Sequence, residues 1–196
     1  MASLIRKEYV MKKPLALLAL ICTSQFASAQ TQSESLFEGV NLSVGVSQIN
    51  TKETTAGTES FKTTVGIAKI NYTFALAFPA KLGVTATVDL RNAKAGTNEV
   101  LASKTPSELT IEPGILLRSD SLVYAKLGSF AARYESNSDG RALSGKTVGL
   151  GVKHYIYDNN FLQFEWTQRT TDAQNAGLAN AKYKQTSPSL LFGYTF

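Results

Sequence analysis

The sequence predicts an all-β protein: an eight-stranded antiparallel up-and-down β-barrel that crosses a membrane. Three observations support this fold class. Apolar and polar residues alternate along most of the chain after residue 35, and a period of two is typical of strands whose faces meet different surroundings. Short and long connections alternate between the predicted strands, as they do in transmembrane barrels. The chain also ends on an alternating row of aromatic residues, which suits a strand that faces lipid.

The beginning of the chain has the features of a secretory signal peptide. Lys12 and Lys13 precede an apolar run over 15–21, which is far shorter than the roughly 20 residues of a membrane helix. Small residues then form a predicted cleavage site before the mature start, in the order Ala27, Ser28, Ala29 and Gln30. We therefore expect a signal peptide over 1–29 and one β-barrel domain over 30–196.

Charge and cysteine content exclude several classes of function. Loss of 1–29 removes four basic residues and one acidic residue, so the formal charge falls from +5 to +2. The basic balance therefore does not indicate a nucleic-acid partner. The single cysteine, Cys22, lies in the predicted signal, so the mature domain would have no disulfide and no thiol chemistry. Translation from Met1 and translation from Met11 are both compatible with this leader.

Eight segments carry the alternation. In the first and third, valine and leucine alternate with small polar residues, and the third is the clearest in the chain. The second is ambiguous in its earlier half, because Val65 and Ile67 lie on the face that becomes polar at Lys69. The fourth alternates but contains Pro113. The predicted strands are 36–49, 61–76, 81–92, 107–118, 121–135, 144–157, 161–172 and 182–196.

The last four segments follow the same rule. In the fifth, sixth and seventh, aliphatic or aromatic residues alternate with glycine and polar residues. The eighth places leucine and three aromatic residues on one face, with Leu191 as the exception on the other face. Proline cannot donate to a strand ladder. We therefore expect a bulge or a missing hydrogen bond at Pro113 and at Pro188.

The connections predict which strand ends lie together. Three connections are tight and rich in turn-forming residues, and four are longer and polar. An even number of strands places both ends of the domain on the side of the tight turns. A soluble sandwich or lipocalin-like barrel would also alternate, but here one face is glycine-rich and polar, which favours a narrow lumen. The tight connections are 78–81, 119–121 and 158–160, and the long ones are near 50–60, 93–106, 136–143 and 173–181.

Four stretches, at 123–128, 151–160, 164–166 and 191–196, resemble the small OmpA/OmpX-type β-barrels of the Gram-negative outer membrane. The resemblance implies an outer-membrane location and a structural or narrow passive-pore, porin-like role. It also implies outer-membrane lipid, the barrel-assembly machinery and periplasmic chaperones as partners. The terminal aromatic residues would then form a C-terminal assembly signal made of Phe192, Tyr194 and Phe196.

Charges of both signs fall on the predicted inward face. Such charges need partners or water in a narrow interior, so we expect an ionic network that acts as a gate or as a structural plug, the plug being favoured. Lys153 and Glu165 lie on neighbouring strands and are expected to meet. A one-residue slip would move Lys69 to the lipid face at a cost of about 2–4 kcal/mol. The predicted network is Lys69, Asp89, Arg91, Glu112, Lys126, Lys153 and Glu165, with Arg169 nearer the loops.

The sequence predicts no catalytic site. The only histidine, His154, lies near a tight turn with no serine beside it in sequence, whereas nucleophilic catalysis needs a nucleophile and an orienting acid within reach. One histidine without a cysteine gives little basis for a metal site. We therefore expect no enzyme, no metal and no cofactor. Binding of a host or cell-surface ligand by the outer loops is the alternative function.

Overall fold

The computed structural model describes residues 36–53, 60–94, 100–136, 139–171 and 183–196, and the account below concerns these residues. The predicted signal peptide and its cleavage residues Ala27, Ala29 and Gln30 lie outside them. The regular elements of the described part are strands, and this part contains no helix that is long and apolar enough to cross a membrane. The strands are β1 (Gly39–Glu53), β2 (Ser60–Ala75), β3 (Ala80–Asp89), β4 (Ala93–Lys94), β5 (Val100–Arg118), β6 (Ser121–Ser136), β7 (Asp139–Tyr157), β8 (Asn160–Thr171) and β9 (Tyr183–Thr195).

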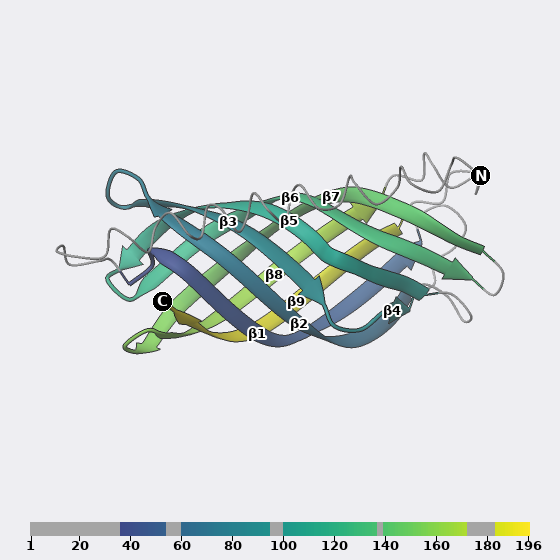
Figure 1. Ribbon diagram of the computed structural model, residues 1–196, viewed down its shortest axis with the longest axis horizontal. Coiled ribbons are helices and arrows are strands. Elements are labelled where there is room, and N and C mark those ends of the chain that lie inside the picture. The colour runs from purple at the N-terminus through teal and green to yellow at the C-terminus, as the bar shows by residue number, and fades with distance from the viewer. Residues whose placement is uncertain (1–35, 54–59, 95–99, 137–138, 172–182) are drawn as a thin grey trace, which may run out of the picture. The chain divides into compact units, whose positions relative to one another are not determined.

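Eight of these strands form a closed antiparallel wall (Figure 1). Sequential neighbours pair along the chain, β1 pairs with β9, and β3 pairs with β5 to complete the circle. The two-residue β4 is an addition beside β5. Closure leaves no free strand edge. The predicted eight-stranded barrel is therefore confirmed.

Several strands differ in length from the prediction. β5 begins at Val100 and β7 begins at Asp139, so both extend well beyond the segments in which the side chains alternate. Backbone pairing continues there because hydrogen bonding between strands needs no apolar face. β3, in contrast, ends at Asp89, and a bend follows it.

The short turns confirm the predicted hairpins and define the turn end of the barrel. They lie at 78–79, 119–120 and 158–159. Asp158 has a positive φ of 43°, which is compatible with the tolerance of aspartate for left-handed turn conformations. The opposite end of the barrel, toward the long connections, is the loop end.

The buried face of β2 points into the lumen in one continuous register. Val65, Ile67 and Lys69 are all buried, and β1 pairs with β2 without a register shift. The two apolar residues pack with Ile49, Ala93 and Leu191. This cluster explains both irregularities of the sequence pattern, because the apolar side chains of β2 and of β9 meet inside the lumen.

Both strand prolines interrupt a ladder without changing its register. The β1–β9 pairing continues on both sides of Pro188 but omits the positions opposite Gln48 and Ile49. The β5–β6 pairing likewise omits Pro113 and its neighbour Glu112. The predicted interruptions of pairing are therefore found at both prolines. The register shifts of β5–β6 lie elsewhere, between Ser103/Glu108 and Leu116/Arg118.

Candidate functional site

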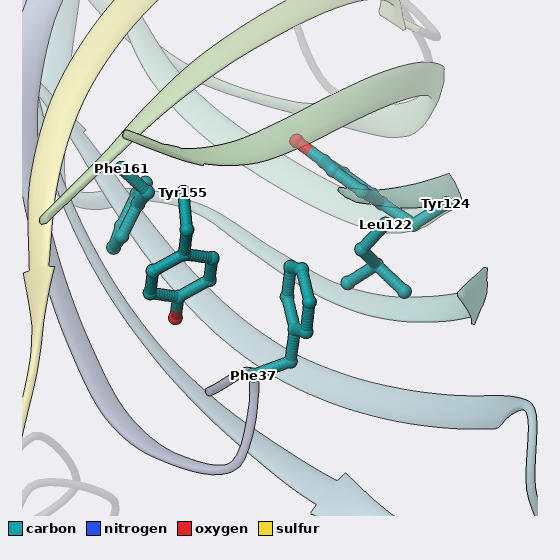
Figure 2. Close-up of a cluster of buried hydrophobic side chains, with 5 residues drawn as sticks. All are labelled: Phe37, Leu122, Tyr124, Tyr155 and Phe161. Atoms are coloured by element: carbon teal, nitrogen blue, oxygen red, sulfur yellow. The ribbon is translucent and has the colours of Figure 1, made fainter. Parts of the chain in front are cut away.

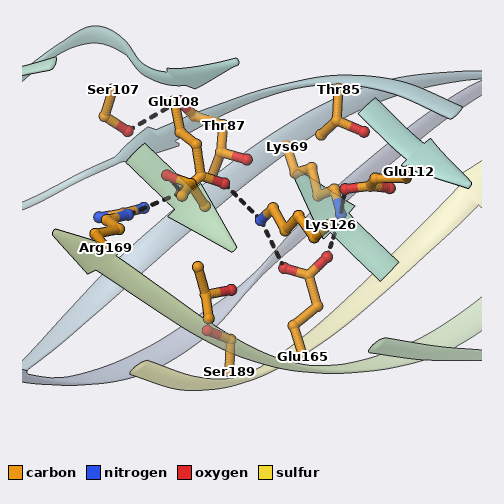
Figure 3. A network of polar contacts seen from close by, with 12 residues as sticks. Lys69, Thr85, Thr87, Ser107, Glu108, Glu112, Lys126, Glu165, Arg169 and Ser189 are labelled. Carbon is orange, nitrogen blue, oxygen red and sulfur yellow. Dashed lines mark hydrogen bonds and ion pairs between the residues drawn. The ribbon is translucent and has the colours of Figure 1, made fainter. Parts of the chain in front are cut away.

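A network of buried ion pairs crosses the lumen (Figure 3). Lys69 projects from β2, and its ammonium lies 2.8 Å from a carboxylate oxygen of Glu112 on β5 and also pairs with Glu165 on β8. Lys126, from β6, lies 3.1 Å from Glu165 and 2.6 Å from Glu108. All five side chains are almost completely buried. The alternating pattern of each strand directs these residues inward, and barrel closure brings them together.

The network continues toward the loop end through Arg169. Its Nη1 donates to Asp89 Oδ2 at 2.6 Å and its Nη2 to Asp89 Oδ1 at 3.2 Å. The Nε of the same guanidinium donates to Glu108 Oε2 at 2.8 Å, and Thr147 donates to that oxygen at 3.3 Å. A planar guanidinium suits such paired contacts with a carboxylate. Arg169 therefore links β8 to β3 and β5 across the lumen.

Neutral side chains complete the hydrogen bonding of Glu165. Tyr124 donates its hydroxyl proton to Glu165 Oε1 at 2.6 Å, and Gln163 donates to the same oxygen at 2.7 Å. With the two lysines, four donors converge on this carboxylate. A buried charge requires such partners to offset the cost of losing its hydration.

The predicted site residues separate into three groups. Lys69, Glu112, Lys126 and Glu165 come together at the centre, and Asp89 joins them through Arg169. Arg91, in contrast, was wrongly predicted to line the lumen. It follows the end of β3, where the chain leaves the ladder, and its side chain is exposed.

Lys153 lies nearer the turn end than predicted. Among the described residues its ammonium donates to Asn41 Oδ1 at 3.3 Å and lies 4.5 Å from the centre of the Phe161 ring, rather than meeting its predicted partner Glu165. The β7–β8 register accounts for this position, because it places Gln163 opposite Lys153 and Gly151 opposite Glu165.

Three further members of the network were not singled out from the sequence. Glu108 could have been found, because it lies four residues before Glu112 on the same face of β5. Tyr124 and Gln163 gave a weaker signal. Tyrosine and glutamine also occur at membrane interfaces and in loops, so only the pairing of β6, β7 and β8 shows that they face Glu165.

An apolar cluster fills the lumen at its turn end (Figure 2). Tyr155 and Phe161 lie in contact, with ring centroids 5.6 Å apart. Two glycines leave space for the aromatic rings of this cluster. A Cβ atom on Gly151 would lie 2.2 Å from Cζ of Tyr124, and one on Gly193 would lie 2.3 Å from Cζ of Phe161. The members of this turn-end cluster are Phe37, Leu122, Tyr124, Tyr155 and Phe161.

The family model for the outer membrane protein beta-barrel domain matches residues 15–196. The chain belongs to this family. It is an integral β-barrel protein of the bacterial outer membrane, as the sequence predicted. No curated protein matches the chain in sequence.

Solved outer-membrane barrels share the fold. Ail, the attachment invasion locus protein of Yersinia pestis, is 14% identical, with a TM-score of 0.51; the match covers 80% of this chain and 99% of Ail. Neisserial surface protein A is 14% identical, with a TM-score of 0.53, over 81% of this chain and 98% of that one. A second structure of Ail contains the heparin analogue sucrose octasulfate. At this level of identity, the similarity establishes the fold of the outer-membrane barrel and no more.

The outer face of this outer-membrane barrel is apolar. Along β9, buried residues alternate with exposed or partly exposed ones. Phe192, Tyr194 and Phe196 are 51%, 41% and 65% exposed. Large exposed apolar surfaces are unusual in soluble monomers, whereas a lipid-facing belt with aromatic residues at its rim is expected of a transmembrane barrel. These three side chains therefore face the bilayer.

The histidine of the outer-membrane barrel has a serine neighbour after all. The β6–β7 register places Ser121 opposite His154, and Ser121 Oγ lies 2.9 Å from His154 Nδ1 and 2.8 Å from Asp120 Oδ1. The serine has one proton, and the carboxylate can only accept it. In this arrangement Ser121 donates to Asp120 and accepts from the imidazole, which is the reverse of what an activated nucleophile requires. Within the described ranges, no three acidic, histidine or cysteine side chains could hold a metal ion.

Proposed function

We propose that this outer-membrane barrel is a structural protein whose lumen is closed at rest. The observation that carries the proposal is the ionic network, in which carboxylates from β5 and β8 contact lysines from β2 and β6 across the interior. A buried apolar cluster that includes Ile49, Val65 and Ile67 also occupies the lumen. Ile67 pairs with Asp89 across β2 and β3, so this cluster adjoins the part of the network that Arg169 reaches.

Planar-bilayer recordings test this role against a passive pore. We expect no discrete conductance steps across a range of salt concentrations and voltages, because an ion would have to displace buried, paired charges. Regular steps that scale with salt concentration would contradict the closed-lumen proposal and favour a narrow pore. Heat-modifiable migration on gels would verify that the recorded sample is folded.

Ligand binding at the cell surface is the second candidate function. A transmembrane β-strand needs only about 9–11 residues, whereas β5 and β7 each have 19 and β6 has 16. β6 and β7 remain paired as far as Ser136 and Asp139. The sheet therefore extends past the bilayer at the loop end, and the sulfated sugar bound by Ail suggests one class of ligand to test.

Replacement of loop tips tests the binding role. Short glycine-serine turns in place of 93–106 and 136–143, which include the outer ends of β5 and β7 as well as the loop tips, should leave the heat-modifiable fold intact. If the loops bind a surface ligand, these variants should lose adhesion to heparin-coated beads and to host cells. Equal adhesion of the parent and the loop variants would exclude the loops as the binding surface.

The assembly role of the last strand is also a proposal. Phe192, Tyr194 and Phe196 would serve recognition by the barrel-assembly machinery after delivery by periplasmic chaperones, and would then contact outer-membrane lipid. Phe196→Ser should lower the folded fraction in the outer membrane. Phe78→Ser, at an aromatic residue that is 87% exposed in a turn, is the matched control and should assemble normally.

We propose in addition that the barrel has no enzymatic activity. The hydrogen-bond directions at Ser121 and His154 support this view. Incubation with outer-membrane lipids, followed by mass spectrometry, should show no chemical change. Turnover by the parent that is lost in His154→Ala would contradict the proposal.

A further inference from the structure

The segment just before β1 enters the lumen at the turn end. Phe37 is completely buried, with 0% of its side chain exposed. Its ring packs edge-on against Tyr155 on β7, with centroids 4.7 Å apart. Phe37 also belongs to the same cluster as Leu122 and Tyr124 on β6 (Figure 2).

These contacts reach across the barrel. In the closed wall, β9, β8 and β7 stand between β1 and β6. A residue that leads into β1 therefore contacts the opposite side of the mouth. Phe37 could not do so from the wall itself, and its segment must turn inward.

Two features hold this turn in place. Glu38 forms an ion pair with Lys81 at the beginning of β3. Gly39 has a φ of +96°, a conformation that side-chain-bearing residues rarely adopt, and a Cβ atom there would lie 3.0 Å from the carbonyl oxygen of Phe196. The ion pair and the glycine direct Phe37 into the mouth.

In outer-membrane barrels the short turns face the periplasm. We propose that residues 36–39 form a latch that closes the lumen at this turn end, and that release of this latch opens the lumen around Lys153 to the periplasm. Lys153 is buried toward this mouth, where its ammonium lies over Phe161, a member of the turn-end cluster. The latch thus covers a buried charge that lies apart from the central ion pairs. The latch controls access from one end only, so its opening can be tested separately from ion conduction through the whole barrel.

A cysteine accessibility experiment tests the latch. Thr73→Cys is the reporter, in a Cys22→Ala background, because Thr73 is buried and pairs with Gly39 across β1 and β2. The folded protein is treated with a charged methanethiosulfonate reagent, and labelling is followed by mass spectrometry. Phe37→Ala should raise the labelling rate at least tenfold. Phe78→Ala removes an equally large ring from the same end, outside the lumen, and should leave the rate unchanged.

A second variant keeps the test decisive. Glu38→Gln keeps the side-chain volume but breaks the ion pair with Lys81, and should raise the labelling rate by a smaller factor. The heat-modifiable shift verifies that each variant is folded. Labelling at the parental rate in folded Phe37→Ala would overturn the latch, and if that variant does not fold, a parental rate in Glu38→Gln would overturn it.

Discussion

At the residue scale, Glu165 is the centre of the lumen. It accepts from Lys69, Lys126, Tyr124 and Gln163, and it is almost completely buried. The arrangement balances the cost of burying the charges with direct pairing. The stability of the barrel should therefore depend strongly on the presence of both signs of charge.

Glu165→Gln should lower the free energy of unfolding by about 3–5 kcal/mol, because it leaves two buried lysines with one carboxylate fewer. Urea unfolding in lipid vesicles measures this change. Addition of Lys69→Met should recover part of the loss, since the double variant restores the charge balance. Strict additivity of the two substitutions would show that the residues are not coupled.

Glycine at 151 is required by the ring that lies over it. Gly151→Ala should destabilise the barrel by about 1–3 kcal/mol, since the added methyl group overlaps Tyr124 in a tightly packed interior. Gly66→Ala is the control, because its Cβ would lie 3.3 Å from the flexible end of Leu90. Equal unfolding midpoints for the two variants would contradict the packing argument.

At the element scale, the ladder between the first and last strands is interrupted at one point. Pairing of β1 with β9 skips the positions opposite Gln48 and Ile49. Proline has no amide proton to donate at position 188. Ser47 compensates in part, because its hydroxyl donates to the Pro188 carbonyl at 3.4 Å.

Amide hydrogen exchange should therefore be faster at Gln48 than at Val44 of the same strand, which pairs with Phe192. Nuclear magnetic resonance in micelles or nanodiscs resolves the two positions. Pro188→Ala supplies a donor and should slow exchange at Gln48. Uniform protection along β1 would show that proline does not weaken the seam.

At the scale of the whole molecule, the barrel reverses the arrangement of a soluble protein, with a polar interior and an apolar exterior. Leu150 is 61% exposed on the outer face of β7, while Lys126 and Lys153 are buried inside. Lipid therefore solvates the outer side chains, while ion pairs and two small apolar clusters fill the interior.

Leu150→Lys should cost about 2–4 kcal/mol in a bilayer, as expected for a lysine near the membrane midplane. Ser144→Lys is the matched control on the same face of β7, beyond the exposed Lys146, and should cost about 0–1 kcal/mol because the penalty falls near the interface. Vesicle unfolding titrations compare the two. A reversed order of the two costs would contradict the assigned outer face.

Much of the fold could be predicted from local pattern. Alternation placed Phe192, Tyr194 and Phe196 on one face, and the tight turns defined three hairpins. Local pattern was insufficient where the alternation failed, at Val65, Ile67 and Leu191. These apolar side chains face the lumen because they pack against one another there, and that contact is visible only in the folded barrel. Arg91 was misplaced for a related reason: the side-chain pattern continues past the point where β3 leaves the ladder.

The sequence by itself determined the strands, their two faces and the membrane that surrounds them, because a period of two is a property of neighbouring residues. Only the tertiary structure decided which charges meet. Lys69 and Glu165 are 96 residues apart, and Arg169 and Asp89 are 80 apart. Their contacts depend on strand register and on closure of the circle, and likewise only the closed mouth gives Phe37 an opposite wall to contact.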